Sequence, residues 1–202
     1  MYDFSIVLPY LSNSECIDLC KKMLHDNSKY SYELIEIIDC NDVYYAYNEG
    51  VKRANTNIVI LINDYMFVSK NWDEYYIKYT NNKNVCTGYL VEPGVIGVSH
   101  KNIKKDFGKT PEKFNRIEFE NWAMKQKIKT KEYIDNQKGW YMPISFNKDT
   151  FIEYPNESKF PTPNDIILID EILPSKGYNF LKINSYVYHL QNFSNKNRVN
   201  RN

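Results

Sequence analysis

The stretch that decides the fold is Asn57–Tyr65, which reads NIVILINDY. Its apolar run from Ile58 to Ile62 lacks the polar alternation of a half-exposed strand, which is typical of a strand buried on both faces in a parallel sheet. The run ends abruptly at Asn63 and Asp64. Because helices must cover both faces of such a strand, we expect it to be the central strand of an α/β domain.

Two more strands of the same kind precede it. Residues 4–8 form an apolar run that ends at Pro9, and residues 34–38 form another that ends at Asp39. Each run is followed by a segment with a different apolar period, so strands and helices alternate through this part of the chain.

The segments between these strands repeat apolar residues at helical spacing, over residues 13–28 and 43–54. Ser12 and Glu15 form a capping box before the first helix, in which the hydroxyl and the carboxylate satisfy end amides. The β-α-β-α-β order predicts a parallel sheet with right-handed crossovers and helices on both faces. Beyond it we expect helices at about 71–80, from Thr110 and at 164–173, and strands at 85–91, 140–146 and 179–189.

Composition and charge narrow the class of protein. The chain has 202 residues, with 26 Lys and Arg against 25 Asp and Glu, and a net charge of +1. This balance argues against a nucleic-acid binder, because such domains carry a basic excess. No apolar run reaches the roughly 18 residues of a spanning helix, and the N-terminus lacks a secretory signal pattern. The four cysteines form no C-x-x-C pair, so we expect buried free thiols and a cytoplasmic protein.

Missing motifs exclude several nucleotide-binding classes. The loop after the first strand, residues 9–13, contains no glycine, whereas a dinucleotide-binding domain needs G-x-G-x-x-G there to let its backbone approach pyrophosphate. The chain also lacks a P-loop, the G-x-S-x-G elbow of hydrolases and the His/Cys spacing of a closed zinc site.

Polar side chains follow the predicted strands at their carboxyl ends, where ligands of open parallel sheets bind. They are Pro9 and Tyr10, then Asp39, then Asn63 and Asp64. Two of these three strand ends carry a carboxylate. The sequence therefore predicts that the three ends converge on one bound ligand.

This pattern resembles the nucleotide-sugar-dependent glycosyltransferases of the GT-A fold, in particular the large inverting family 2. Members open with a Val/Ile strand that ends in proline, as residues 4–10 do, and their second strand ends in an aspartate, as at Asp39. An Asn-x-Gly helix follows, here Asn48–Gly50, and then an apolar strand with a D-x-D-like motif, here Asn63–Tyr65.

Two later features are also similar to that family. An acidic residue opens a helix that runs to a Gly-Tyr pair, as in Asn164–Tyr178, and a histidine ends a late strand, as at His189. The resemblance implies a single α/β domain with a Rossmann-like, mainly parallel central sheet flanked by helices. That GT-A domain would span 1–191, divided into a nucleotide-binding half (1–90) and an acceptor-binding half (91–191), and a polar tail would span 192–202.

The resemblance implies an inverting hexosyltransferase. Its donor would be a nucleotide sugar, UDP-linked rather than GDP- or TDP-linked, and its acceptor a hydroxyl group of a glycan or glycoconjugate. Transfer needs a cation against the leaving diphosphate, a base for the acceptor hydroxyl, and in-line alignment of the two substrates.

On the donor side, the resemblance implies that Asp39 binds the uracil or the ribose, since a carboxylate accepts hydrogen bonds from N–H and O–H groups. The alternative for Asp39 is a turn that caps the following helix. Pro9 and Tyr10 would line the same pocket through backbone contacts and ring stacking, and Asn48 and Asn63 would complete it.

The resemblance places Asp64 on the diphosphate or metal side, with a turn cap as the alternative. Tyr65 stands where the family has the last aspartate of its D-x-D motif, which often binds the metal directly. We therefore expect that binding of Mn²⁺ or Mg²⁺ is weak, is supplied by Asp64 and His189, or is absent. The alternative is that His189 is a buried core histidine whose ring nitrogens form hydrogen bonds within the protein.

Asp165 is the expected base for the acceptor hydroxyl, with Asp170 and Glu171 in reserve. At a helix start, Asp165 would otherwise be a charge that favours the helix dipole. Trp140 and Tyr141 are candidates to stack on a sugar face.

Two other classes of protein stay open. A non-catalytic module that binds a nucleotide sugar or a glycan would keep the fold and lose the metal aspartate, as Tyr65 suggests. An unrelated doubly wound domain, such as a receiver-like module, would need an acid pair after its first strand, where Pro9 and Tyr10 stand.

Overall fold

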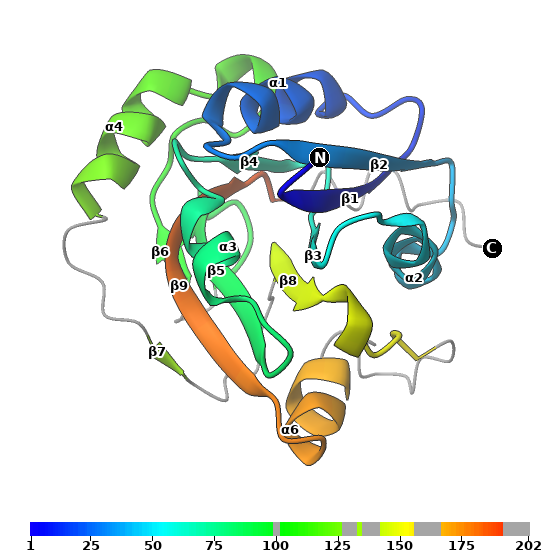
Figure 1. Cartoon of the computed structure of the whole chain (residues 1–202). Coiled ribbons are helices and arrows are strands. Elements are labelled where there is room, and N and C mark those ends of the chain that lie inside the picture. The colour runs from blue at the N-terminus through cyan, green and yellow to red at the C-terminus, as the bar shows by residue number, and fades with distance from the viewer. Residues whose placement is uncertain (99–101, 127–132, 135–141, 156–166, 192–202) are drawn as a thin grey trace.

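Nine strands form one curled sheet in the part of the chain that the structure describes (Figure 1). The structure is a computed structural model that describes residues 1–98, 102–126, 133–134, 142–155 and 167–191. The strand order along the main path is β2-β1-β3-β8-β5-β9-β4, with β6 paired to β5 and β7 paired to β9.

Helices and strands alternate in the first half of the chain, and strands dominate the second half. The strands are β1 (Phe4–Tyr10), β2 (Tyr32–Ile38), β3 (Ile58–Leu61), β4 (Met66–Val68), β5 (Asn84–Glu92), β6 (Ile103–Lys104), β7 (Tyr133–Ile134), β8 (Ile144–Asn147) and β9 (Asn179–His189). The helices are α1 (Ile17–Asn27), α2 (Val43–Arg53), α3 (Glu74–Tyr79), α4 (Arg116–Gln126) and α6 (Leu173–Ser175), with 3-10 turns at Pro111–Lys113 and Lys148–Thr150 and a π turn at Leu168–Ile172.

The predicted β-α-β-α-β unit is confirmed. β1 lies between β2 and β3 and is parallel to both, with Val7 beside Ile35 on one side and Leu61 on the other. α1 and α2 cover opposite faces of these strands (Figure 1). Phe4 and Leu8 are fully buried as a result, and the continuous apolar run of β1 follows from this double cover.

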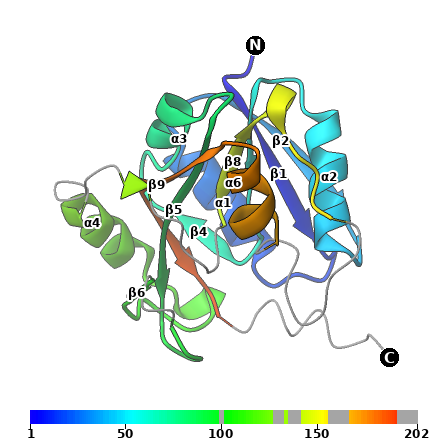
Figure 2. The same cartoon turned by 90° about the horizontal axis from the view of Figure 1, so that it is seen from below.

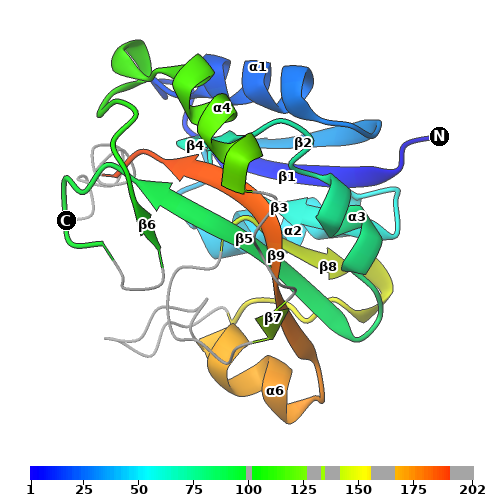
Figure 3. The same ribbon diagram turned by 90° about the vertical axis from the view of Figure 1, so that its left-hand side faces the viewer.

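The sheet is mixed, with four parallel and four antiparallel pairings between the described strands. β8 is antiparallel to both β3 and β5, so β5 runs in the same direction as β3. β9 is parallel to β5, and Figure 3 shows both pointing to one side. The carboxyl ends of β1, β2, β3, β5 and β9 therefore lie along one edge of the sheet, which we call the carboxyl edge.

α1 begins at Ile17, and the capping box predicted from Ser12 and Glu15 is wrong. Cys16 is the N-cap residue, and its side chain makes no capping hydrogen bond. The amide of Ser12 and the hydroxyl of Ser14 donate instead to carboxylates at the ends of β2 and β3. The hydroxyl of Ser14 also accepts from the amide of Cys16 at 3.2 Å, so it connects the start of α1 to the carboxyl edge.

The helix predicted from Thr110 is interrupted. A 3-10 turn at Pro111–Lys113 comes first, and α4 begins only at Arg116. Between them Phe114 turns inward and stacks on Tyr188 of β9, with ring centroids 5.0 Å apart. The half-buried ring packs against the core at the point where the helix is interrupted.

Three further elements differ from the sequence prediction. β4 is a short buried strand that no pattern indicated. The strand predicted over 140–146 is found at Ile144–Asn147: Met142 and Pro143 lie before it outside any strand, and residues 140–141 lie outside the described part of the chain. Of the helix predicted over 164–173, the described part runs from Leu168 to Ser175 as a π turn followed by α6 (Figure 2).

All four cysteines are free thiols, as predicted, and only Cys40 is not buried. Burial raises the pKa of Cys86 to about 11. Among the described residues, we find no helix with the length and apolar character needed to cross a membrane.

α2 approaches β1 very closely at Gly50. A Cβ atom at this position would lie 2.1 Å from Cγ1 of Val7, which is fully buried. Glycine is required here by the spacing of helix and strand.

We predict that Gly50→Ala lowers the free energy of unfolding by about 1–3 kcal/mol, net of the better helix propensity of alanine, because extra atoms enter a packed core. Gly97→Ala is the matched control, since nothing lies within 4 Å of the Cβ that it adds. We expect that control to change stability by about 0.5 kcal/mol or less. Urea unfolding measures both, and equal stability of the two variants would contradict the close contact.

A charged network joins α4 to α1. Arg116 donates to Asp26 Oδ2 at 2.6 Å and to Glu120 Oε1 at 2.7 Å, and Asn27 also donates to Glu120, at 2.8 Å. The hydrogen bond from Arg116, with smaller effects of Lys22, lowers the pKa of Asp26 well below its ordinary value of 3.8.

Because the folded-state pKa of Asp26 is depressed, its contribution to stability is present above about pH 4 and is lost as the pH falls further. We predict that Asp26→Asn is less stable than the wild type at pH 5–7 and that this difference narrows below pH 4. Urea unfolding over that range measures it. A difference that stays constant down to pH 3 would show that the carboxylate charge is not involved.

Candidate functional site

Asp39 joins the carboxyl ends of β2 and β1. Its backbone amide donates to the carbonyl of Tyr10 at 2.9 Å, and its carboxylate accepts from the amide of Ser12 at 2.7 Å. Its φ of 56° lies in the left-handed region, which Asp and Asn tolerate better than most residues. Capping of α2, the alternative role for Asp39, is performed by Asp42, which accepts from two amides of the first turn.

Asp64 lies just after β3 and is only 7% exposed. Its Oδ2 accepts a hydrogen bond from the hydroxyl of Ser14, in the loop that Asp39 also holds. Burial, and then the neighbouring charge of Asp64, raise the pKa of the Cys20 thiol well above its usual range. Two carboxylates from different strand ends thus meet the same short loop, Ser12–Ser14.

Asn63 is engaged within the protein. Its Oδ1 accepts from the hydroxyl of Tyr47 in α2 at 2.5 Å, and its backbone carbonyl lies 3.9 Å from Sγ of Cys20 in α1. The turn after β3 is therefore held by helices on both faces of the sheet.

Asn48 is buried in α2 and binds the backbone of Tyr154. Its Nδ2 donates to the Tyr154 carbonyl at 3.0 Å, and its Oδ1 accepts from the Tyr154 amide at 2.9 Å. This pair holds the segment after β8 against α2. The donor-site role of Asn48 stays a prediction, and these contacts do not favour it.

Pro9 and Tyr10 are the last residues of β1, so the strand does not stop before Pro9 as its sequence suggested. Pro9 pairs in register with Ile37 of β2. The hydroxyl of Tyr10 donates to Glu36 at 3.2 Å, and Nζ of Lys21 lies 5.1 Å from the centre of its ring. The tyrosine therefore packs toward α1, and its stacking on a nucleotide base stays a prediction.

β9 ends at His189, next to the end of β5. Its Nδ1 lies 2.7 Å from Oε1 of Glu92. Its ring packs against that of Tyr65, with centroids 5.4 Å apart, and the amide of Leu190 donates to the Tyr65 carbonyl at 3.0 Å. Tyr65 thus connects the turn after β3 to the end of β9.

Sequence reasoning missed Glu92, Ser14 and Tyr47 as parts of this arrangement. Glu92 carries the same signal as Asp39, a carboxylate at a strand end. Its relevance depends on the direction of β5, which only the pairing with β8 establishes.

Three predicted residues, Asp165, Trp140 and Tyr141, lie outside the described part of the chain. The reserves for the base are described: Asp170 is half-buried in the π turn, and Glu171 is exposed there.

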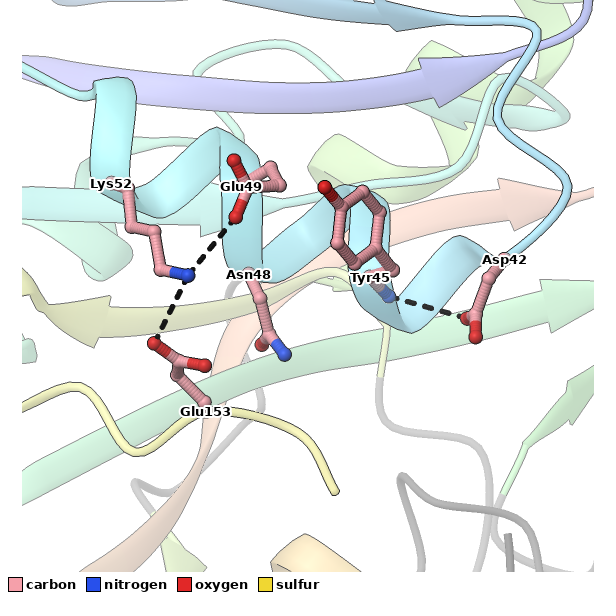
Figure 4. Close-up of a pocket in the computed structure, with 6 residues that line it drawn as sticks. All are labelled: Asp42, Tyr45, Asn48, Glu49, Lys52 and Glu153. Carbon is pink, nitrogen blue, oxygen red and sulfur yellow. Dashed lines mark hydrogen bonds and ion pairs between the residues drawn. The ribbon is translucent and has the colours of Figure 1, made fainter. Parts of the chain in front are cut away.

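A hollow of about 390 Å³ lies between α2 and the segment that carries Glu153 (Figure 4). Within it Lys52 donates to Glu49 at 3.0 Å and lies 3.3 Å from Glu153, so its charged groups largely satisfy one another. Neither Asp39 nor Asp64 borders it. Its lining is Asp42, Tyr45, Asn48, Glu49, Lys52 and Glu153.

Solved structures with a similar fold are GT-A glycosyltransferases. GalNAc-T7 with UDP, GalNAc and Mn²⁺ is similar over 94% of this chain and 44% of its own, with a TM-score of 0.60 and 12% identity. S. aureus TarS 1–349 in complex with UDP is similar over 92% of this chain and 60% of its own, with a TM-score of 0.55 and 10% identity. A197 from STIV is similar over 94% of this chain and 86% of its own, with a TM-score of 0.55 and 10% identity.

These likenesses show that the chain has a GT-A-like fold, as its sequence predicted. The chain spans about half the length of the first two structures. No family model and no curated protein matches it.

We predict that Asp39→Ala is less stable than Asp39→Asn by about 1–2 kcal/mol, because alanine loses the bond to Ser12 and disfavours a left-handed backbone. Asparagine keeps an acceptor oxygen and tolerates the positive φ. Urea unfolding of the two variants measures the difference. If they unfold together, the side chain of Asp39 does not hold the loop.

Proposed function

We propose that this protein is an inverting glycosyltransferase that moves a hexose from a nucleotide-sugar donor to a hydroxyl group of a glycan or glycoconjugate. The observation that carries the proposal is the contact of both Asp39 and Asp64 with the loop Ser12–Ser14. It brings two carboxylates together at the carboxyl edge, where open α/β sheets bind their ligands. Two of the similar structures hold UDP, which favours a UDP-linked donor.

Asp39 is the proposed contact of the nucleoside. It is exposed beside Tyr10, and a carboxylate accepts hydrogen bonds from a uracil N–H or a ribose hydroxyl. Pro9, Tyr10 and Asn63 belong to the same proposed pocket.

Asp64 and His189 are the proposed ligands of Mn²⁺ or Mg²⁺. The metal would neutralise the charge that grows on the leaving diphosphate. No three His, Cys, Asp or Glu side chains come together to hold a metal within the described residues. Both ions accept phosphate oxygens readily, so the donor itself would complete the coordination.

Asp165 is the proposed base. The acceptor oxygen attacks the anomeric carbon and passes its proton to the Asp165 carboxylate, while the bond from that carbon to the diphosphate oxygen breaks. A single in-line displacement of this kind inverts the anomeric carbon. Asp170 and Glu171 are the alternatives for this role.

A second function, binding of a nucleotide sugar or a glycan without catalysis, is favoured by Tyr65. Tyr65 stands in place of the last aspartate of the D-x-D motif, and its ring packs against that of His189. Such a module would bind UDP without turning over a donor.

We expect Asp64→Asn to lower UDP release from a donor and acceptor pair by at least about 100-fold, because it removes the charge opposite the metal. Asparagine can still accept from Ser14, so the fold should be kept. Asp18→Asn, an exposed change in α1, is the control and should keep wild-type turnover.

A thermal-shift panel of UDP-, GDP- and TDP-sugars with and without Mn²⁺ identifies the donor, because stabilisation rises with ligand concentration over Kd. UDP-dependent stabilisation without turnover would support the second function. Stabilisation by none of these ligands would refute the proposed transferase and any module that binds a nucleotide sugar. Full turnover in EDTA would refute the proposed role of the metal.

A further inference from the structure

Glu92 is a buried carboxylate that the proposed reaction does not use. It ends β5 and is only 3% exposed. Its Oε1 lies 2.7 Å from Nδ1 of His189, and its Oε2 accepts from Nδ2 of Asn102 at 3.1 Å. A buried carboxylate is costly unless hydrogen bonds compensate it, and these two contacts do so on both oxygens.

The sheet fixes the backbones of both partners. β5 and β9 are parallel, and the pair Val91 and Tyr188 places the next residues, Glu92 and His189, side by side. On its other side, Glu92 pairs with Lys104 of β6, and His189 pairs with Met66 of β4. The two side chains therefore meet from rigid strands and not from loops.

This contact selects one form of the imidazole. An ionised carboxylate only accepts hydrogen bonds, so Nδ1 of His189 carries a hydrogen and Nε2 of the neutral ring keeps its lone pair. A carboxylate that holds a histidine in this way orients the ring and makes the other nitrogen a better ligand. The packing of Tyr65 on the same ring restrains it further.

We infer that Glu92 is a positioning residue, which holds His189 in the Nδ1–H tautomer so that Nε2 can bind the metal at the donor diphosphate. Glu92 itself touches neither metal nor donor. The inference rests on the proposed function, because it supposes that His189 meets the metal-bound donor.

The tautomer can be measured without any ligand. Long-range ¹H–¹⁵N spectra of the imidazole groups at pH 8 report which nitrogen of His189 is protonated. We expect Nδ1–H in the wild type and in Asn102→Ala, which keeps the bond from Glu92 to the ring. We expect a loss of this preference in Glu92→Gln, since a carboxamide can donate as well as accept. An Nε2–H tautomer in the wild type would overturn the inference.

The consequence for binding is measured by calorimetry with UDP and Mn²⁺. We expect Glu92→Gln to weaken binding by about 10-fold to 100-fold, the usual effect of losing such a supporting carboxylate. Asn102→Ala should change it by less than about threefold, since it leaves the bond to the ring intact. The double variant Glu92→Gln/His189→Ala should bind no more weakly than His189→Ala alone, because Glu92 acts only through the histidine.

The outcomes separate the inference from the proposed function. If the wild type binds neither UDP nor Mn²⁺, the proposed function fails, whatever the tautomer. If His189→Ala weakens binding and Glu92→Gln does not, or if the two effects add, the inference fails and the proposed function stands. Thermal unfolding without ligand shows whether each variant folds. If Glu92→Gln does not fold, Glu92→Asp replaces it with the same expectation, because the shorter side chain does not reach the imidazole ring.

Discussion

The shared direction of β1, β2, β3, β5 and β9 is the constraint on which the rest of the structure depends. β1, β2 and β3 pair in parallel, as do β5 and β9, and β8 joins the two groups because it is antiparallel to both β3 and β5. Because of it, the carboxyl end of every one of these strands reaches one edge, bringing polar groups from distant parts of the sequence into one region. The bonds of Ser12 to Asp39, Ser14 to Asp64 and Glu92 to His189 all lie there.

Burial gives this edge its chemical character. Asp64 and Glu92 are almost fully buried, and each is held by a hydrogen bond from a neighbouring strand end or loop. Their orientation is therefore fixed before any ligand arrives, which reduces the ordering needed on binding. Carboxylates at such an edge repel a bare diphosphate, so a cation between them and the phosphates is the arrangement that favours binding. The exposed carboxylate of Asp39 can accept hydrogen bonds from N–H or O–H groups, as its proposed contact with a nucleoside requires.

The strands and helices that are neighbours in the sequence could be predicted. The pairing of strands that are far apart in the sequence could not. β1 to β3 and the two helices between them are visible in the sequence because their apolar periods are regular. The loop Ser12–Ser14 was misinterpreted as a helix cap, because serine followed by glutamate before a helix is the usual sequence of a capping box. The local sequence does not show that Asp39 and Asp64 accept hydrogen bonds from this loop instead. Glu92 has the local signal of a carboxylate at a strand end, but its contact with His189 could not be predicted, because it requires the register of β5 on β9. Asp39, Asp64 and His189 could be proposed as site residues from the sequence because each lies at or just after a strand end, whereas the internal bonds of Asn48 depend on Tyr154, which is far along the chain.

The central claim is that the carboxyl edge binds one nucleoside diphosphate. Amide ¹H–¹⁵N shifts during a titration with UDP and Mg²⁺ test it residue by residue. We predict that the amide signals of Ser12, Asp39 and Asp64 shift together with one common Kd, while those of Tyr45 and Glu153 in the hollow beside α2 do not shift. Shifts confined to that hollow, or different affinities at Asp39 and Asp64, would contradict it.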